Sequence, residues 1–305
     1  MPNIWTHILF AEDVCDQLER HDLIETSGRF LALGAQGPDP FFYYNFWPKL
    51  NDRGVPDIGM KLHTEKCGSF LHNIIKRGKH EKNQSQAYIL GFVTHHILDR
   101  ITHPYIHYRS GYEGHKHQIF EVIIDTIILD RYRNLKTWKT PAYKHIQLSN
   151  HEAKKLAQWI EQEIYIQFPH AVQIVPSNYV VQSFMDIALA QRLLFDPTGW
   201  KHQLLGTLVS PFSHRPIDKK IDYLNETNLE WKHSATGEIS TSSFIDLYEK
   251  AFADACVIME RILQYWGSTN EHQLEKIVDL IGDISYDTGK PLTLGLDNAY
   301  SDPIV

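Results

Sequence analysis

The chain has 305 residues, of which 43% are hydrophobic and 22% are charged, and its formal net charge at pH 7 is -7. This usage is typical of a globular protein with a sizeable core. The acidic balance argues against general binding of nucleic acid, which depends on contacts from Lys and Arg to phosphates. It does not exclude a small anionic substrate that is attracted by bound metal ions.

The cysteines and the hydropathy of the sequence bear on the cellular compartment of the protein. The three cysteines, Cys15, Cys67 and Cys256, are far apart and form no CxxC pair, so we expect reduced thiols. Residues 1–7 lack the basic region and apolar run of a secretory signal. No window approaches the roughly 18 consecutive apolar residues of a transmembrane helix. We therefore expect a cytoplasmic protein without a transmembrane segment, and the sequence leaves its oligomeric state open.

One candidate functional residue is associated with each of the first two predicted helices. Residues 4–20 form an amphipathic pattern with His7 in the first turn, where a lone histidine is usually structural. A second helix, 27–35, must end at the turn 36–40, because the prolines there cannot continue it. Asp39 therefore lies on a loop after a buried helix. This position suits a metal ligand or a base at a pocket rim, although such an aspartate often serves only the turn.

Aromatic residues and a further histidine follow this turn. The dense aromatic run 41–47 predicts core packing or the wall of an apolar pocket. After the polar loop 51–59, a helix is expected to begin with His63 at its start. A polar connection at 76–86 leads into a buried central helix that is expected to end near Pro104.

The central stretch concentrates groups that bind metals. Six of the eighteen histidines fall within 31 consecutive residues. His95 and Asp99 are four residues apart on a helix, so they share one face and can reach a single ion. His117 and Glu121 repeat this spacing on the next helix, and Asp125 continues their stripe one turn later. Helices that present such pairs inward are the arrangement by which bundles build multinuclear sites.

These pairs favour a metal site over a purely structural role. A single buried histidine is more often a hydrogen-bonded core residue than a ligand. Here two His-x3-carboxylate pairs occur with His103 and His107 between them, and a buried cluster of this kind without a cation would cost several kcal/mol. Imidazole with carboxylate suits zinc first, while iron or manganese is possible.

The rest of the chain is expected to complete the fold with helices and without strands of any length. The stretch 197–241 has no clear periodicity, so we expect a long irregular segment that acts as a lid or a partner surface. The tail from Ser285 onward is rich in Gly, Pro and Asp and shows no functional signal. Residues 126–132 are expected to extend the helix that carries His117 and Glu121. Further helices are predicted at 150–168 after Ser149 or Asn150, at 176–195 after Ser177, at 244–265 after Ser242 or Ser243, and at 273–282.

The predicted fold class is therefore all-α. We expect a single multi-helix domain over residues 1–305, with a multinuclear metal site in its helical core. The residues of the metal site are expected within about 1–135, and residues 136–305 would supply further helices and the irregular segment. No internal repeat is visible.

Several motifs of the first 130 residues or so form a pattern together. In this order they resemble the zinc-dependent phospholipase C family, whose helical fold is shared with the single-strand-specific zinc nucleases. The His-x3-Asp pair followed by the His-x3-Glu pair is the most specific part. The matching elements are Trp5-Thr6-His7, Gln36-Gly37-Pro38-Asp39, His63, the stretch from Gly91 to Asp99, and His117-x3-Glu121-x3-Asp125.

In that family three zinc ions are bound, and the resemblance implies which residues would hold them. Asp99 would bridge two of the ions. The implied ligands are Asp39, His63, His95 and Asp99 for one part of the cluster, an intervening histidine with His117 and Glu121 for another ion, and His7 as a contributor to the third.

The sequence departs from the family pattern in two places. In secreted members a tryptophan freed by processing supplies its amine and carbonyl to one zinc, whereas Trp5 is internal here, although removal of the initiator methionine would free the Pro2 amine. The family also shows Asp-x3-Pro-x-His, whereas Pro104 directly follows His103 in this chain. Either His103 or His107 could therefore be the intervening ligand. His103 continues the helical stripe, and we favour His107 slightly because it lies beyond the proline.

The resemblance implies a zinc-dependent phosphodiesterase that uses two or three ions and a metal-activated water on a small phosphoester or a phospholipid. Asp39 is the candidate general base or water-orienting residue, and Asp125 the expected acceptor for the outer nitrogen of a ligand imidazole. Two alternatives stay open. One is a nuclease or phosphomonoesterase on the same site, although the chain lacks the basic character that single-strand binding requires. The other is a non-catalytic metalloprotein.

Overall fold

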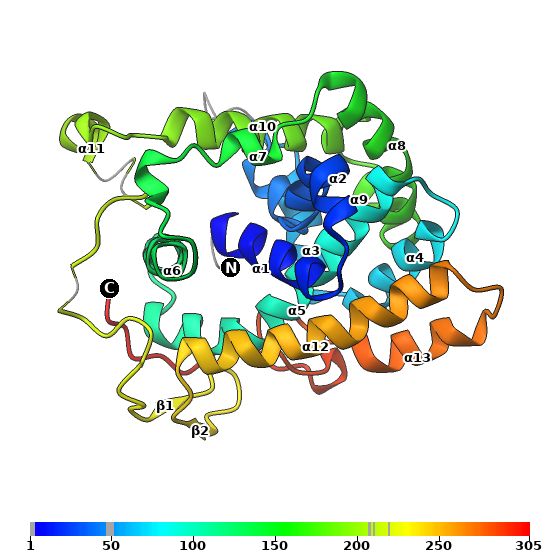
Figure 1. The fold of residues 1–305 in the computed structure, drawn as a ribbon. Helices are drawn as coiled ribbons and strands as arrows, with labels where there is room; N and C mark the ends of the chain where they lie inside the picture. Colours follow the sequence, from blue (N-terminus) through cyan, green and yellow to red (C-terminus); the bar gives the residue numbers. More distant parts are fainter. Residues whose placement is uncertain (1–3, 47–51, 207–208, 210, 219) are drawn as a thin grey trace.

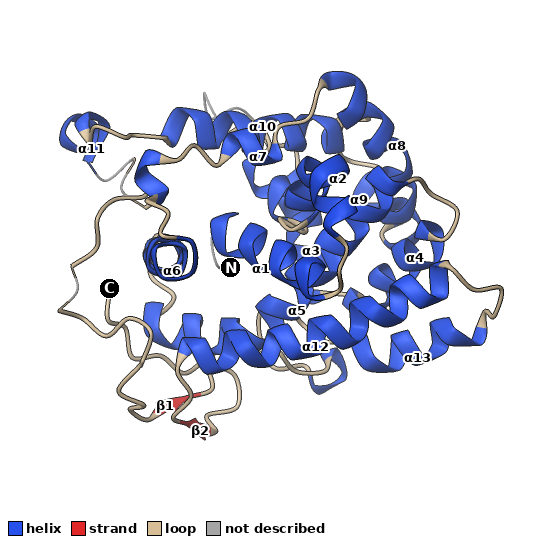
Figure 2. Cartoon of the chain, in the orientation of Figure 1, coloured by secondary structure: helices blue, strands red, loops and turns tan. Residues whose placement is uncertain are grey.

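The computed structural model confirms the all-α class (Figure 2). It describes residues 4–46, 52–206, 209, 211–218 and 220–305, so the predictions for Pro2 and Trp47 lie outside the described residues. In this part of the chain the strands are limited to one antiparallel pair of two residues each, β1 (Trp231–Lys232) and β2 (Ile239–Ser240). The helices are α1 (Ile4–Gln17), α2 (His21–Gly34), η1 (Asp39–Tyr43), α3 (Val55–Thr64), α4 (Cys67–Gly78), α5 (Asn83–Ser110), α6 (Lys116–Arg133), η2 (Thr137–Lys139), α7 (Tyr143–Ile146), α8 (Asn150–Gln167), α9 (Pro169–Val172), α10 (Tyr179–Leu194), α11 (Trp200–Leu205), α12 (Phe244–Trp266), α13 (His272–Ile281) and η4 (Leu292–Leu294), where η marks a 3-10 helix.

Helix α5 is the central element of the fold. It packs against α1, α2, α6 and α12 (Figure 1). Every side chain from Ala87 to Arg100 is buried, and no charged residue precedes Asp99 in this stretch. A helix that is apolar on all faces is stable only when other helices enclose it. The predicted central helix is therefore confirmed, and it carries candidate ligands into the interior.

Two glycines allow α2 and α5 to cross in close contact. A Cβ atom at Gly91 would lie 2.2 Å from the carbonyl oxygen of Leu31, and one at Gly34 would lie 2.1 Å from that of Tyr88. Side chains do not approach backbone oxygens so closely, so only glycine permits this crossing. The crossing fixes the part of α5 that leads directly into His95.

We expect Gly91→Ala to lower the free energy of unfolding by about 3 kcal/mol, because backbone atoms would have to move to admit the new methyl group. Chemical denaturation monitored by circular dichroism would measure the loss. Gly28→Ala on α2 is the matched control, since a Cβ there would meet no atom within 4 Å. The control should leave stability unchanged or raise it by up to about 1 kcal/mol. Equal stability of the two variants would contradict the prediction.

Helix α5 continues through Pro104, where the sequence predicted its end. A proline inside a helix leaves the carbonyl four residues earlier, here that of Arg100, without its N–H donor. The backbone of Gly289 lies over this carbonyl: its φ is +61°, and a Cβ there would be 2.0 Å from the oxygen. The interrupted turn is thus covered by the C-terminal tail. As a result, His103 and His107 lie on the same helix.

His63 lies in the last turn of α3, which corrects the prediction that it starts a helix. Gly54, with a φ of +75°, precedes α3, and Pro56 occupies the first turn, where proline is favoured. Lys66 adopts a left-handed conformation with a φ of +52° and separates α3 from α4. The glycine and proline that suggested a loop therefore form the start of a helix.

Serine caps define the starts of two of the three later helices for which a cap was predicted. Ser149 and Ser243 each accept a hydrogen bond from the third backbone N–H of their helix and complete capping boxes at α8 and α12, as predicted. Ser177 does not cap α10, because the helix begins after Asn178, whose side chain makes no capping hydrogen bond. The predicted start of α10 was therefore too early.

The stretch 197–241 contains more local structure than predicted. It includes α11 and the β1–β2 pair, and the indole Nε1 of Trp231 donates a hydrogen bond of 2.9 Å to the carbonyl of Ser242. The side-chain amide of Asn225 donates to the carbonyl of Leu229, also at 2.9 Å, and closes the turn before β1. Short-range hydrogen bonds of this kind leave no periodic signal in a sequence.

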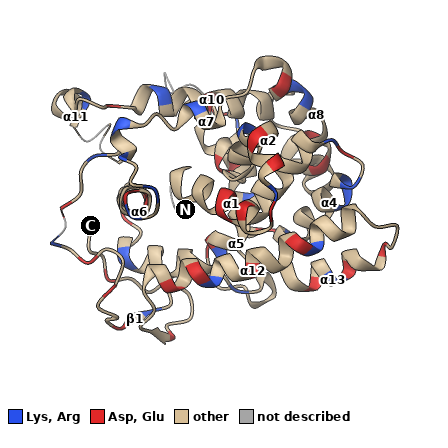
Figure 3. Ribbon diagram, viewed as in Figure 1, with Lys and Arg blue, Asp and Glu red and all other residues tan. Residues whose placement is uncertain are grey.

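The charged residues do not gather on one side in the view of Figure 3. Lys and Arg are interspersed with Asp and Glu along the ribbon. Within the described residues, no helix combines the length and the apolar character needed to cross a lipid bilayer.

Candidate metal centre

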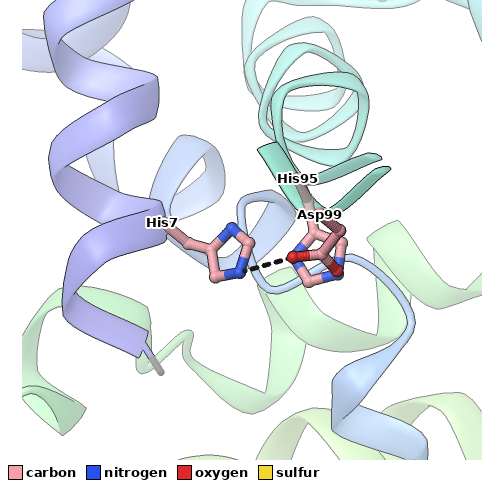
Figure 4. Close-up of side chains that lie close together, drawn as sticks. All are labelled: His7, His95 and Asp99. Carbon is pink, nitrogen blue, oxygen red and sulfur yellow. Dashed lines mark ion pairs between the residues drawn. The ribbon is translucent and has the colours of Figure 1, made fainter. Parts of the chain in front are cut away.

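Helix α5 presents three candidate ligands, one per turn, to the same region. Asp99 Oδ2 lies 2.9 Å from Nε2 of His95, and Asp99 Oδ1 lies 3.6 Å from Nε2 of His103. From α1, His7 places its Nε2 3.3 Å from Asp99 Oδ1 (Figure 4). The rings of His7 and His95 stack with their centroids 4.2 Å apart. The buried carboxylate of Asp99 is therefore shared by three imidazoles.

Asp39 and His63 extend this cluster beyond His95. Asp39 Oδ1 lies 3.3 Å from Nε2 of His63 and 4.0 Å from Nε2 of His95. Asp39 opens the 3-10 helix η1 instead of lying in an irregular loop. Gly37 has a φ of +49°, and a Cβ there would lie 2.3 Å from the His95 ring. The glycine thus allows the turn to place Asp39 beside His95 without displacing the imidazole.

Helix α6 contributes the next pair. Nε2 of His117 lies 2.6 Å from Oε1 of Glu121, and the rings of His103 and His117 are 5.7 Å apart. Each group of three that could hold one ion has its ligand atoms within 4.8 Å of one another; two of the groups share His95, and two share His103. Within the described residues these groups are His7, His95 and Asp99; Asp39, His63 and His95; His103, His117 and Glu121; and His103, His107 and Asp287.

Backbone carbonyls fix the tautomer of three of these imidazoles. A carbonyl only accepts hydrogen bonds, so the Nδ1 atom that faces it must carry the proton and donate it. The Nε2 lone pair is then directed into the cluster, as in protein zinc sites. The distances from Nδ1 to the carbonyl oxygen are 2.7 Å for His63 and Gly59, 2.9 Å for His95 and Ala35, and 2.9 Å for His103 and Tyr286.

The buried polar atoms of the cluster fit a cation. Nε2 of His95 and Nε2 of His103 are buried and make no hydrogen bond to any residue that the structure describes. Both nitrogens carry lone pairs and face the acceptor oxygens of Asp99. Leaving a buried polar group unsatisfied costs about 1–3 kcal/mol, whereas a cation would satisfy all of these acceptors at once. A donor set of imidazole and carboxylate is one that zinc prefers.

Burial favours the neutral form of several histidines in and beside the metal centre. It lowers the pKa of His103 to about 4 and that of His96 to about 3, and it lowers the pKa of His7 as well. Burial alone would raise the pKa of Asp99, but the neighbouring histidines, His103 first among them, hold it well below its usual range. Neutral imidazoles and an ionised carboxylate are the forms that bind metal.

We expect the metal-free protein to lose stability as the pH falls from about 6.5 to about 4. His96 and His103 have folded-state pKa values below the 6.5 of an unperturbed histidine, so the unfolded chain binds more protons in this range. The free energy of unfolding therefore decreases on acidification, by about 3 kcal/mol for His103 alone. Urea unfolding with a chelator present would measure this slope.

Two variants test whether the buried histidines cause this dependence of stability on pH. His96→Gln should reduce the dependence of stability on pH, because one buried imidazole is removed. His21→Gln should leave it unchanged, since His21 is exposed. Unchanged stability of the wild-type protein between about pH 6.5 and pH 4 would contradict the expected protonation states.

A cleft of about 510 Å³ opens onto the cluster. Its volume is in the range of small-molecule sites. Phe42 and Tyr43 line it, so part of the predicted aromatic run forms a wall, while Phe41 is buried in the core. Phe212 from the stretch 197–241 lines the cleft as well. The candidate ligands that also line the cleft are Asp39, His63, His103, His107, His117 and Glu121.

The family of the chain follows from a comparison with family models. The model described as zinc dependent phospholipase C matches residues 6–176, which is more than half of the chain. The chain belongs to the zinc-dependent phospholipase C family. The matched segment contains the candidate residues from His7 to Asp125. Neither the curated proteins nor the solved structures contain a match to the chain.

Asp125, within the segment that matches the zinc-dependent phospholipase C model, connects α6 to the start of α1. Its carboxylate accepts hydrogen bonds from the backbone N–H groups of Trp5 and Thr6, both at 2.9 Å, and lies 3.2 Å from Nε2 of His214. We expected it to accept from a ligand imidazole. Instead it satisfies the free N–H groups of the first turn of α1, from which His7 projects.

The two histidines on either side of Pro104 have different neighbours. His103 shares one group with His117 and Glu121, whereas His107 belongs only to the group that contains Asp287. Nε2 of His107 lies 3.8 Å from Oδ1 of Asp287. The grouping of ligand atoms favours His103 as the partner of the His117 pair, whereas the sequence slightly favoured His107, whose ring is nearer to that of His117, at 4.6 Å against 5.7 Å.

Asp287 is a candidate residue that the sequence did not indicate. It lies in the tail that was expected to show no functional signal, and outside the segment that matches zinc-dependent phospholipase C. Its Oδ1 is 3.5 Å from Nδ1 of His103, and the ring of Tyr286 packs against those of His63 and His96. No sequence signal marked this residue, because contacts between distant parts of the chain bring the tail onto α5.

Proposed function

We propose that this protein is a zinc-dependent phosphodiesterase that hydrolyses phospholipids or related small phosphodiesters. The observation that supports this proposal best is the cleft of about 510 Å³, which is lined by overlapping groups of histidines and carboxylates. The family name points to the same chemistry. We further propose that residues 1–305 form one domain around this site.

The ligand set that we propose serves three zinc ions. Asp99 would be shared, because three imidazoles face its two oxygens. His103 is assigned in place of His107 because its ligand atom lies within 4.8 Å of those of His117 and Glu121. The proposed ligands are Asp39, His63, His95 and Asp99 for the first ion, His103, His117 and Glu121 for the second, and His7 with Asp99 for the third.

Zinc, when bound, would offset the charge of the phosphate and lower the pKa of a water molecule toward neutrality. Within the chain, Asp39 is the candidate to orient that water and accept its proton. Its side chain is 12% exposed and lines the cleft, whereas that of Asp99 is fully buried and does not line it. Asp39 is therefore within reach of a substrate phosphate, and Asp99 is restricted to holding ions.

The apolar side of the cleft would bind the non-phosphate part of the substrate. Phe42, Tyr43, Ile187 and Phe212 come from three separate parts of the chain and form this side. Aromatic walls bury large apolar areas and suit lipid or aryl groups. We therefore propose that the leaving group is apolar, as a diacylglycerol is.

Metal analysis and substrate profiling of the purified protein test this proposal. We expect two or three equivalents of zinc, with hydrolysis of phosphatidylcholine vesicles faster than that of p-nitrophenyl phosphate or single-stranded DNA. Glu121→Ala should lower both zinc content and activity. Glu113→Ala is the matched control, because its side chain is exposed and belongs to none of the ligand groups. Folded wild-type protein that binds no zinc would overturn the proposal, and faster hydrolysis of the monoester or of DNA would change the substrate class.

A further inference from the structure

Residues 284–291 of the C-terminal tail form a small loop that is held together by its own hydrogen bonds. Ile284 and Pro291 form a bridge, and the backbone N–H of Ser285 donates to the carbonyl of Lys290. The hydroxyl of Ser285 accepts hydrogen bonds from the N–H groups of Asp287 and Thr288, at 3.2 and 3.3 Å. The side chain of Asp287 takes no part in these bonds, so the loop is formed without it.

The loop is docked on the histidines of the metal centre. The backbone N–H of Tyr286 donates to the carbonyl of His63, and the carbonyl of Ile284 accepts from Nε2 of His96 at 2.9 Å. The ring of Tyr286 is fully buried, and its centroid is 4.5 Å from that of His96 and 5.8 Å from that of His95. These contacts fix the backbone on both sides of Asp287 relative to α5.

The docked loop brings two acceptors to the outer nitrogen of His103. Nδ1 of His103 lies 2.9 Å from the carbonyl oxygen of Tyr286 and 3.5 Å from Oδ1 of Asp287. Both acceptors require the proton on Nδ1, which leaves Nε2 as the lone pair that faces Asp99. A carboxylate behind a ligand imidazole also makes it a stronger donor to the metal.

The carboxylate of Asp287 also faces His107, the histidine on the other side of Pro104. Oδ1 of Asp287 lies 3.8 Å from Nε2 of His107, and the rings of His107 and His117 are 4.6 Å apart. Among the described residues, the ion pairs of Asp287 are made with His103 and His107 alone. The carboxylate of Asp287 therefore faces both histidines that lie on either side of Pro104.

We propose that Asp287 is a positioning residue of the metal centre: its carboxylate, with the carbonyl of Tyr286, holds His103 in the orientation and tautomer that bind the ion shared with His117 and Glu121. This inference rests on the proposed function, and it makes the C-terminal tail a part of the active site. Asp287 lies outside the matched segment 6–176.

The zinc affinity of the protein, measured by competition with a chromophoric chelator, tests the proposal. Asp287→Asn keeps the size of the side chain and removes its charge. We expect it to weaken the binding of one zinc equivalent by roughly 10- to 100-fold, as for other outer carboxylates of zinc sites. Asp287→Glu, which keeps the charge, should restore part of the lost affinity. Activity at limiting zinc should follow the same order.

Asp283→Asn is the matched control for damage to the tail. The carboxylate of Asp283 accepts a hydrogen bond of 2.8 Å from the backbone N–H of Gly68 and belongs to none of the ligand groups. It should bind zinc as the wild-type protein does, and the metal-free forms of Asp283→Asn and Asp287→Asn should melt within a few degrees of each other.

The outcomes distinguish this inference from the proposed function. Wild-type protein that binds zinc, together with Asp287→Asn of equal affinity, overturns the positioning role alone. Equal losses of affinity in Asp283→Asn and Asp287→Asn also overturn it, because the tail would then act only through folding. Wild-type protein that binds no zinc overturns the proposed function, and the positioning role with it.

Discussion

Asp99→Ala is expected to release at least one bound zinc ion and to lower phosphodiesterase activity by roughly 10³-fold or more, since each ion contributes several kcal/mol to catalysis. The carboxylate lies 2.9 to 3.6 Å from Nε2 atoms of His7, His95 and His103. No other carboxylate of the described residues has this position between three imidazoles. Zinc content by elemental analysis and initial rates at saturating substrate would measure both losses.

Two controls test whether the effects of Asp99→Ala arise from the metal site. Asp254→Ala removes an exposed carboxylate from α12 and should change neither zinc content nor rate. The metal-free form of Asp99→Ala should unfold at a midpoint close to that of the metal-free wild type, because the alanine also removes a buried charge. A variant that keeps its full zinc content would rule out Asp99 as a shared ligand.

The ligand pairs on α5 and α6 could be predicted because their spacing is local. Four residues make about one helical turn, so a helix over these residues places His95 above Asp99 and His117 above Glu121 wherever the helix lies. The apolar stretch before Asp99 also showed that α5 is enclosed. The all-α class and the central helix followed from the same periodicity.

Ligand candidates outside these two helices depended on the family resemblance. His7 and His63 were weak candidates on their own, and only tertiary packing brings them within 3.3 Å of Asp99 and Asp39. His63 was predicted at the start of a helix but lies in the last turn of one. A Gly-Val-Pro sequence reads as a loop, but here Gly54 and Pro56 begin α3, so His63 lies at the end of that helix.

Asp287 could not be predicted because its neighbours are distant in the sequence. It follows His103 by more than 180 residues, in a loop whose conformation depends on Ser285 and Gly289 and not on a repeating pattern. The same loop covers the turn of α5 that Pro104 interrupts, where the sequence predicted the end of the helix. Long-range contacts of this kind are encoded neither by propensity nor by spacing.

Asp39→Asn is expected to lower the turnover number by about 10²- to 10⁴-fold, the usual contribution of a general base. The amide that replaces the carboxylate would keep one oxygen 3.3 Å from His63, the distance that Asp39 Oδ1 has now, but it could not accept a proton. Rates measured over a range of added zinc would separate the two roles that we propose for Asp39. Loss of a ligand should be overcome by excess zinc, whereas loss of a base should not.

The exposed carboxylate of Asp57 in the first turn of α3 provides the control for this substitution. Asp57→Asn should retain the wild-type rate, because it removes the same charge from the neighbouring helix without touching the cluster. Full activity of Asp39→Asn at saturating zinc would restrict Asp39 to holding an ion, and the proton would then have to leave through another group of the cleft. A low rate at every zinc concentration, with normal zinc content, would place the proton transfer at Asp39.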